Sequence, residues 1–167
     1  VIEYGTKAGA DVILIETMQD SYELKAAVLA AKEHSDLPVC ATVVFDEKGK
    51  MLTGGTPESV VALLEGLHID ALGINCSLGP RQIKPFVERM IQVSSTPIIV
   101  TPNAGLPQTD DEGHTYYDMN ADEFASEMKE IASLNVHVLG GCCGTTPEYL
   151  SKTIELVKDL PIEPPVK

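Results

Sequence analysis

Short runs of apolar residues recur along the chain, and within most of them apolar and polar positions do not alternate. The runs are rich in Val, Ile and Leu, a pattern that is typical of strands buried on both faces of a parallel sheet. We therefore predict five strands, over residues 11–16, 37–45, 70–76, 97–101 and 136–140.

Segments with apolar residues at helical spacing separate these runs, and they predict helices. Thr56-Pro57 and Thr146-Pro147 each place a capping residue before a first-turn proline, and Asn120 is followed three residues later by Glu123. Strand and helix alternate throughout, which favours a parallel sheet with crossover helices. The predicted helices cover residues 21–33, 57–67, 80–93, 121–134 and 147–159.

The number of strand–helix units fits part of a (β/α)8 TIM barrel. A complete barrel takes about 250 residues, so five of its eight units need roughly 155 residues, close to the 167 of this chain. We predict an α/β fold with five barrel units in residues 1–160 and the start of a linker in residues 161–167. An open, doubly wound sheet is the alternative, but no glycine-rich phosphate-binding fingerprint follows the first predicted strand.

The ends of the chain suggest a piece of a longer protein. The first residue is Val1 rather than Met, and the proline-rich stretch 161–165 is typical of a linker. In a partial barrel both edge strands and part of the core face would be exposed. We expect the isolated chain to be poorly stable or to associate.

Composition and charge exclude several classes of partner. With 44% hydrophobic residues the chain has enough apolar material for a packed core. Its formal net charge of −13 argues against nucleic acids and anionic membranes, since neither polyanion attracts an acidic surface. No apolar run approaches the about 20 residues of a membrane-spanning helix. Four cysteines without a dense disulfide pattern fit a reducing compartment, so we expect a cytoplasmic protein.

Two long loops follow the carboxyl ends of predicted strands, over residues 46–56 and 102–120. The second is the longest stretch without a convincing strand or helix, and long loops in compact domains are usually functional or mobile. Its acidic run, residues 110–112, is interpreted as a solvated surface. The histidines lack metal-ligand spacing and are expected at the surface or at the ends of elements; they are His34, His68, His114 and His137.

Candidate chemistry lies at the carboxyl ends of the strands, where the active sites of parallel barrels are built. Cys142 and Cys143 follow the fifth predicted strand, between glycines that allow the backbone to leave strand geometry. Cys76 ends the third strand. Three protein ligands with one position open are typical of a catalytic rather than a structural zinc site. The open position would accept a substrate thiol and keep it deprotonated near neutral pH.

Other interpretations of these residues remain open. The paired cysteines are also compatible with small buried residues in a tight turn or with a vicinal redox pair, and Cys76 with a buried strand end. Cys40, inside the second apolar run, is expected in the core. Glu16 would either pair with a helix cap or bind an ammonium group of a substrate. Asn103 follows the fourth strand in a sequence that favours a simple turn.

Apart from Cys40, these candidate residues lie in four motifs: Asp11–Thr17, Gly73–Pro80, Pro102–Pro107 and Gly140–Pro147. Together they resemble the homocysteine-binding domain of cobalamin-dependent methionine synthase, over essentially the whole chain. The paired cysteines with the upstream Asn-Cys are the most specific element of this resemblance to homocysteine S-methyltransferases. The third motif favours the methionine synthase branch over the betaine-dependent branch.

The resemblance implies that the chain covers about strands 4 to 8 of the barrel, with their helices. It implies that Cys76, Cys142 and Cys143 are zinc ligands and that Asn103 is the fourth ligand before substrate arrives. Glu16 would bind the amino group of homocysteine. The homocysteine thiolate would then take a methyl group from methylcobalamin, giving methionine.

The same resemblance implies partners outside the chain, namely a cobalamin-binding domain and a methyltetrahydrofolate-binding domain. Betaine or S-methylmethionine as methyl donor is the alternative within the same class. The alternative of a different class is a non-catalytic fragment or binding module whose cysteines pack or form a vicinal disulfide. In the family a loop after the first strand also contacts the amino acid, and no residue here replaces it. We therefore expect the isolated chain to be inactive.

Overall fold

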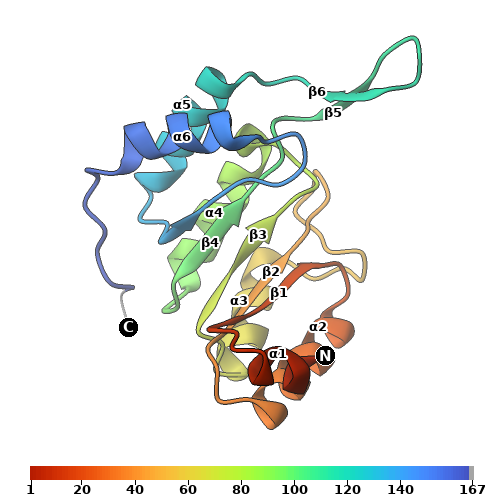
Figure 1. Ribbon diagram of the computed structural model, residues 1–167, viewed down its shortest axis with the longest axis vertical. Helices are drawn as coiled ribbons and strands as arrows, with labels where there is room; N and C mark the ends of the chain where they lie inside the picture. Colours follow the sequence, from red (N-terminus) through yellow and green to blue (C-terminus); the bar gives the residue numbers. More distant parts are fainter. Residues whose placement is uncertain (166–167) are drawn as a thin grey trace.

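The computed structural model describes residues 1–165 and contains one parallel sheet of five strands with crossover helices (Figure 1). Every pair of neighbouring strands is parallel, as the alternation of strands and helices predicts. In sheet order the strands are β1 (Ile13–Met18), β2 (Val39–Val43), β3 (Ala71–Asn75), β4 (Ile98–Thr101) and β7 (Val138–Leu139). The helices are α1 (Ile2–Lys7), α2 (Ser21–His34), α3 (Pro57–Gly66), α4 (Pro80–Val93), α5 (Ala121–Ala132) and α6 (Pro147–Val157).

The predicted helix starts are found in the structure. Thr56 and Asn120 each form a capping box, in which the side chain accepts a backbone N–H and a residue three positions later bonds back. Thr146 is the N-cap of α6 with Pro147 in its first turn, although its side chain makes no capping bond. These local bonds satisfy donors that helix formation leaves free, so the helix boundaries are encoded locally.

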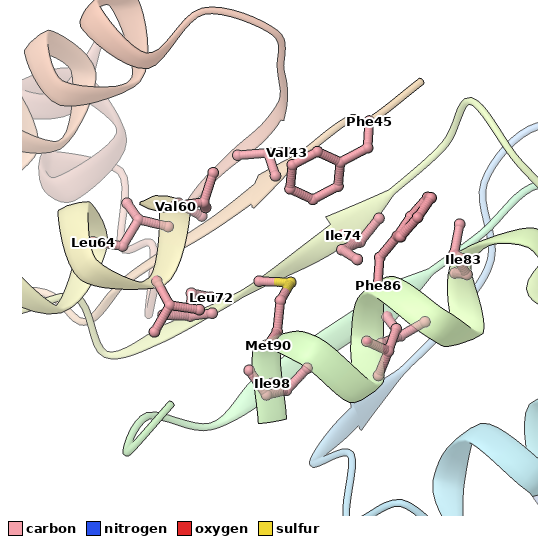
Figure 2. Packing of buried hydrophobic residues seen from close by; sticks show 14 of the residues in the cluster. Val43, Phe45, Val60, Leu64, Leu72, Ile74, Ile83, Phe86, Met90 and Ile98 are labelled. Atoms are coloured by element: carbon pink, nitrogen blue, oxygen red, sulfur yellow. The ribbon is translucent and has the colours of Figure 1, made fainter. Parts of the chain in front are cut away.

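The core lies between one face of the sheet and the helices that cover it (Figure 2). Alternate residues of β2 and β3 point to this face because side chains alternate along a strand. Leu64 of α3 and Met90 of α4 are fully buried against them. Phe45 and Phe86 meet edge to face with ring centroids 6.0 Å apart, a favoured aromatic geometry. This packing holds the carboxyl ends of β2 and β3 in fixed positions.

The expectation that all five strands are buried on both faces is wrong for β1 and β7. Leu14 of β1 is 53% exposed and Val138 of β7 is 46% exposed. Both strands lie at the edges of the sheet, as expected for a partial barrel. Cys40 is half-buried rather than in the core, because it lies opposite Leu14 in the sheet register and shares that less covered face. Burial nevertheless raises the pKa of the Cys40 thiol.

The segment expected to lack strands contains a short antiparallel hairpin, β5 (Pro107–Thr109) and β6 (Thr115–Tyr117), which projects from the rest of the molecule (Figure 1). Strands of three residues are too short for a periodic signal. Asp110 organises the connecting turn, because its Oδ1 accepts the N–H groups of Glu112 at 2.9 Å and of His114 at 2.8 Å. The acidic run is exposed, as expected, but its first residue also shapes the hairpin.

The chain ends in a segment without regular structure after α6. Glu163 exchanges two hydrogen bonds with the side chain of Asn135, at 2.8 and 3.0 Å, and so ties this segment to the loop before β7. Of the predicted linker, residues 166–167 lie outside the described residues. Among residues 1–165, none of the helices has the length and apolar character needed to cross a membrane.

Two leucines of α2 provide a test of this packing. Leu24 is fully buried and Leu29 is 40% exposed. We expect Leu24→Ala to lower the free energy of unfolding by about 2–5 kcal/mol, because it leaves a cavity. Leu29→Ala should change it by about 0.5 kcal/mol or less. Urea unfolding followed by circular dichroism measures both, and equal losses would contradict the described packing of α2.

Candidate metal centre

Three cysteine side chains from two distant loops meet at the carboxyl end of the sheet. Cys76 directly follows β3, and Cys142 and Cys143 follow β7. The Sγ atoms of Cys76 and Cys143 are 3.7 Å apart, those of Cys142 and Cys143 are 3.9 Å apart, and all three lie within 4.8 Å of one another. Among residues 1–165 this is the one cluster of His, Cys, Asp or Glu side chains with the geometry to share a metal ion.

The turn after β3 presents Cys76 through an uncommon backbone conformation. Cys76 and the following Ser77 both have positive φ, at 55° and 65°, in a region that non-glycine residues seldom adopt. The turn is held because the Cys76 N–H donates to the Thr101 carbonyl at 3.0 Å and the Ser77 hydroxyl donates to the Phe45 carbonyl at 3.1 Å. These bonds connect the ends of three neighbouring strands and fix the cysteine at their edge.

The loop that carries the paired cysteines is bonded to the segment after β4. The Cys142 N–H donates to the Pro102 carbonyl at 2.8 Å, and the Cys143 carbonyl accepts the Ala104 N–H at 2.9 Å. The three glycines around the paired cysteines were expected to let the backbone leave strand geometry. Only Gly144 has a positive φ, at 79°. Gly140 and Gly141 are required for space instead, since a side chain at either would collide with a nearby threonine.

Asn103 is buried beside this loop, and its Oδ1 accepts the backbone N–H of Cys143 at 3.1 Å. Its side chain therefore does more than favour a turn, because it holds one of the cysteines in place. The amide oxygen retains a second lone pair. Its predicted role as a metal ligand stays a prediction.

Glu16 lies inside β1 rather than at its end, and its side chain is exposed. The sheet register shifts between Ile15 and Met18, and Thr17 within this bulge has a φ of 63°. The buried Asn75 holds the bulge, because its Oδ1 accepts the Thr17 N–H at 3.0 Å and its Nδ2 donates to the Thr17 hydroxyl at 2.6 Å. Sequence reasoning missed Asn75, although a polar residue that ends a continuous apolar run was a signal.

A cavity of about 430 Å³ adjoins Cys76 at the ends of β1, β2 and β3. The loop over residues 46–56 forms one wall. The residues lining the cavity include Thr17, Phe45, Lys50, Met51, Cys76 and Ser77. The space is large enough for a small substrate beside the sulfur of Cys76.

The surroundings of the paired cysteines shift their pKa values in opposite directions. Burial, together with the hydrogen bond to Cys76, raises the pKa of Cys142 to about 12. Hydrogen bonds from Cys76 and from Tyr117 lower the pKa of Cys143 against the opposing effect of its burial. Burial and the hydrogen bond to Cys143 raise the pKa of the Tyr117 phenol. Without a metal, Cys142 thus keeps its proton near neutral pH, and Cys143 ionises more readily than an ordinary cysteine.

The spacing of the sulfurs fits a tetrahedral zinc site. Zinc–sulfur bonds of about 2.3 Å at tetrahedral angles place sulfur atoms about 3.8 Å apart, and the two shorter separations are 3.7 and 3.9 Å. All four cysteines of the chain are free thiols. The donor set therefore fits a thiolate-binding metal with one coordination position left open.

Comparison with known proteins gives a consistent assignment. Methionine synthase from Mycobacterium leprae is 35% identical over 155 residues, which cover 89% of this chain and 13% of that protein. The chain thus spans a small part of this relative's length. Crystal structures of the homocysteine methyltransferase MmuM from Escherichia coli have the same fold. The apo form has a TM-score of 0.76 at 22% identity, covering 93% of this chain and 53% of that chain. The metallated form has a TM-score of 0.73 at 23% identity, covering 91% and 47%.

These structural likenesses confirm the α/β barrel class predicted from the sequence. A family model described as homocysteine S-methyltransferase matches residues 2–157, nearly the whole chain. The chain therefore belongs to the homocysteine S-methyltransferase family.

Proposed function

We propose that this chain is the part of a zinc-dependent homocysteine S-methyltransferase domain that holds the metal. The observation that carries the proposal is the convergence of Cys76, Cys142 and Cys143 at the strand ends of a member of this family. Zinc, when bound, supplies the positive charge that keeps a substrate thiol deprotonated near neutral pH. The three cysteines would hold it, and Asn103, whose amide oxygen accepts the Cys143 N–H, would be the fourth ligand before substrate binds.

Substrate recognition is assigned to the neighbouring strand ends. Homocysteine carries an ammonium group, and the exposed carboxylate of Glu16 on β1 is a suitable partner for it. The bulge at Thr17 changes the direction of the chain directly after Glu16. The cavity between the ends of β1 and β3 offers space for the carbon chain that joins the ammonium group to the thiol. The substrate would thus be held at both ends.

We infer that the methyl donor is methylcobalamin carried by another domain, with methyltetrahydrofolate bound by a further one. The support is the resemblance to cobalamin-dependent methionine synthase and the 35% identity to a methionine synthase of which this chain covers only 13%. The expected reaction takes place in the cytoplasm, where cysteines stay reduced. Methylcobalamin would supply a methyl group and keep the electron pair of the carbon–cobalt bond on cobalt, and a homocysteine thiolate on the zinc held by Cys76, Cys142 and Cys143 would accept that methyl group to give methionine.

The chain is proposed to supply strands 4 to 8 of the barrel. The exposed edges β1 and β7 are the strands that further units would cover. A cavity of about 390 Å³ lies beside β7 and α6, and further barrel units would also cover its apolar walls. Among the residues that form these walls are Leu139, Leu150, Ile154 and Val157. Catalysis is therefore expected of the complete barrel and not of this chain alone.

Metal analysis tests the ligand set. We expect about one zinc ion per chain in the complete domain and its loss in Cys142→Ser, because two thiolates hold zinc poorly. Cys40→Ser is the matched control and should keep the metal, since Cys40 lies in β2 away from the cluster. Equal zinc contents in wild type and Cys142→Ser, measured by atomic absorption, would refute the proposal.

The same site predicts a pH dependence of metal binding. Because the pKa of Cys142 is raised to about 12, this thiol is protonated near neutral pH before the metal arrives, and binding must release the proton. The apparent Zn²⁺ affinity should therefore rise as pH rises through neutrality. Titration calorimetry in buffers of different ionisation enthalpy measures the released protons, and an affinity independent of pH would argue against thiolate coordination.

Glu16→Gln tests substrate binding in the complete enzyme. Removing the charge should raise KM for homocysteine by about tenfold or more, since a hydrogen bond between charged groups contributes about 1.5–3 kcal/mol. The zinc content should stay unchanged. Glu23→Gln, an exposed glutamate in α2, is the control and should leave KM unchanged. Steady-state kinetics decides, and identical KM values for the two variants would exclude the assigned role.

A further inference from the structure

Four polar side chains are buried among the described residues, and one of them joins strands that are not neighbours. Asn103 holds the loop after β7, Thr153 donates within α6, and the hydroxyl of Thr42 in β2 has no hydrogen-bond partner. Asn75 of β3 is 1% exposed, and its side chain reaches Thr17 of β1, although β2 lies between these strands. The bridge thus connects two strand ends that carry predicted site residues.

The bridge holds an extra residue in β1. Glu16 and Thr17 together lie opposite the single residue Thr42 of β2, and such a bulge bends a strand and changes the direction of its side chains. Thr17 has a φ of 63°, which a β-branched residue seldom adopts unless its surroundings hold it. Asn75 provides this support, because it bonds both the N–H and the hydroxyl of Thr17, at 3.0 and 2.6 Å. The direction of Glu16 therefore depends on Asn75.

The backbone of Asn75 leads directly to a cysteine of the cluster. Cys76 is the next residue, and its N–H donates to the Thr101 carbonyl of β4 at 3.0 Å. Asn75 and Glu16 lie on the same face of the sheet, because side chains alternate along each strand and the register joins the two strands through β2. Asn75 thus stands between the sulfur that would bind a metal and the carboxylate proposed to bind the ammonium group of the substrate.

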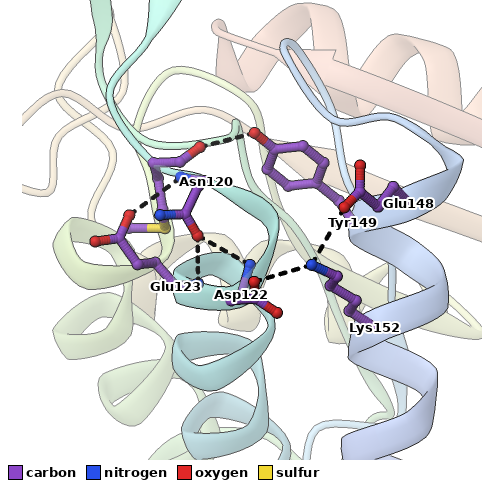
Figure 3. A network of polar contacts seen from close by, with 7 residues as sticks. Asn120, Asp122, Glu123, Glu148, Tyr149 and Lys152 are labelled. Atoms are coloured by element: carbon purple, nitrogen blue, oxygen red, sulfur yellow. Dashed lines mark hydrogen bonds and ion pairs between the residues drawn. The ribbon is translucent and has the colours of Figure 1, made fainter.

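The polar contacts between α5 and α6 differ from this bridge (Figure 3). Lys152 of α6 lies 2.9 Å from a carboxylate oxygen of Asp122 and 3.2 Å from one of Glu148 (Figure 3). Both carboxylates are largely exposed, and ion pairs in such surroundings contribute little. These contacts join two helices that cover the sheet, whereas the buried Asn75 bridge joins strand ends at the candidate site. Asn75 is therefore the stronger candidate for a role in substrate selection.

We propose that Asn75 is a positioning residue that sets the distance between the two ends of the substrate site and so selects homocysteine over free cysteine. This inference rests on the proposed function, in which the substrate sulfur binds at the metal and its ammonium group binds Glu16. Free cysteine has the same two groups with one methylene fewer between them, so it cannot reach both ends when their distance is fixed. One methylene typically allows discrimination by a factor of about 10–200.

Asn75→Ala in the full-length enzyme removes the bridge and leaves the main-chain bond that holds Cys76. We expect KM for homocysteine to rise by about tenfold or more, the lower end of that factor. The inhibition constant of free cysteine, measured in competition with homocysteine, should stay unchanged, because cysteine engages only one end. The kcat value and the zinc content should also stay close to wild type. A merely structural loss would lower kcat and leave the relative affinities for the two thiols unchanged.

Hydrogen–deuterium exchange of the metal-free protein measures the bridge itself. The Thr17 N–H donates to Asn75 and should exchange faster in Asn75→Ala than in wild type. Thr17→Val preserves the shape of the side chain and removes only the hydroxyl that accepts from Asn75. It should raise KM for homocysteine by a smaller factor, with no further rise when both substitutions are combined, because the two groups act through one bond. Thr17→Val decides the question if Asn75→Ala fails to fold.

Thr42→Val is the matched control. Thr42 is 2% exposed and lies opposite the same bulge, but its hydroxyl has no partner, so neither KM nor the inhibition constant should change. Lys152→Met, which breaks the contacts between α5 and α6, should change neither as well. A wild-type KM in Asn75→Ala would overturn the inference, as would equal losses of affinity for homocysteine and free cysteine. A wild-type enzyme that binds neither zinc nor homocysteine would overturn the proposed function, a result distinct from these.

Discussion

Three sulfur atoms, which would gain negative charge on binding a metal, are confined within 4.8 Å of one another, and much of the surrounding structure serves to keep them there. The main chain from Thr101 to Ala104 accepts or donates hydrogen bonds on both sides, to the turn after β3 and to the loop after β7. The segment after β4 therefore acts as a spacer between two ligand loops that do not pair directly. Its position depends in turn on the buried sheet beneath it, which is why a rigid core is a requirement of the site.

The backbone at the carboxyl ends of the strands is strained at selected points. Thr17, Cys76 and Ser77 all have positive φ without being glycines, and each such residue costs roughly 1–3 kcal/mol. Cys76 and Ser77 follow the fully buried β3, whereas Thr17 lies in the bulge of the less buried edge strand β1, and each of the three is held by specific hydrogen bonds. Strained residues of this kind gather at functional sites, where the rest of the fold offsets their cost. His68 and Asn135, in the loops that precede β3 and β7, also have positive φ, so it is the position of Thr17, Cys76 and Ser77 at the carboxyl ends of the strands that connects their strain with the site.

Sequence patterns were sufficient to predict the parallel sheet, because continuous apolar runs and helix caps are local signals. They also predicted that Cys76 and the paired cysteines would approach one another, since the carboxyl ends of parallel strands lie at one edge of a sheet. The left-handed turn at Cys76 and the bridge from Asn75 to Thr17 were not predicted. Each depends on groups that are distant in sequence, and none has a residue type, such as glycine, that marks its backbone geometry. The incomplete burial of β1 follows from its place at the edge, which no pattern within the strand encodes.

The ligand loops have a further consequence that concerns the unfolded chain. Cys76 and Cys143 are 67 positions apart in sequence, so an ion bound to both would close a long loop in the same way as a covalent cross-link. Closing a loop of this length removes conformational freedom from the unfolded ensemble, and metal binding of this kind contributes directly to folding free energy. The ion would join the end of β3 to the end of β7 across the intervening β4. The metal proposed to deprotonate the substrate thiol would then also hold the last strands of the sheet together.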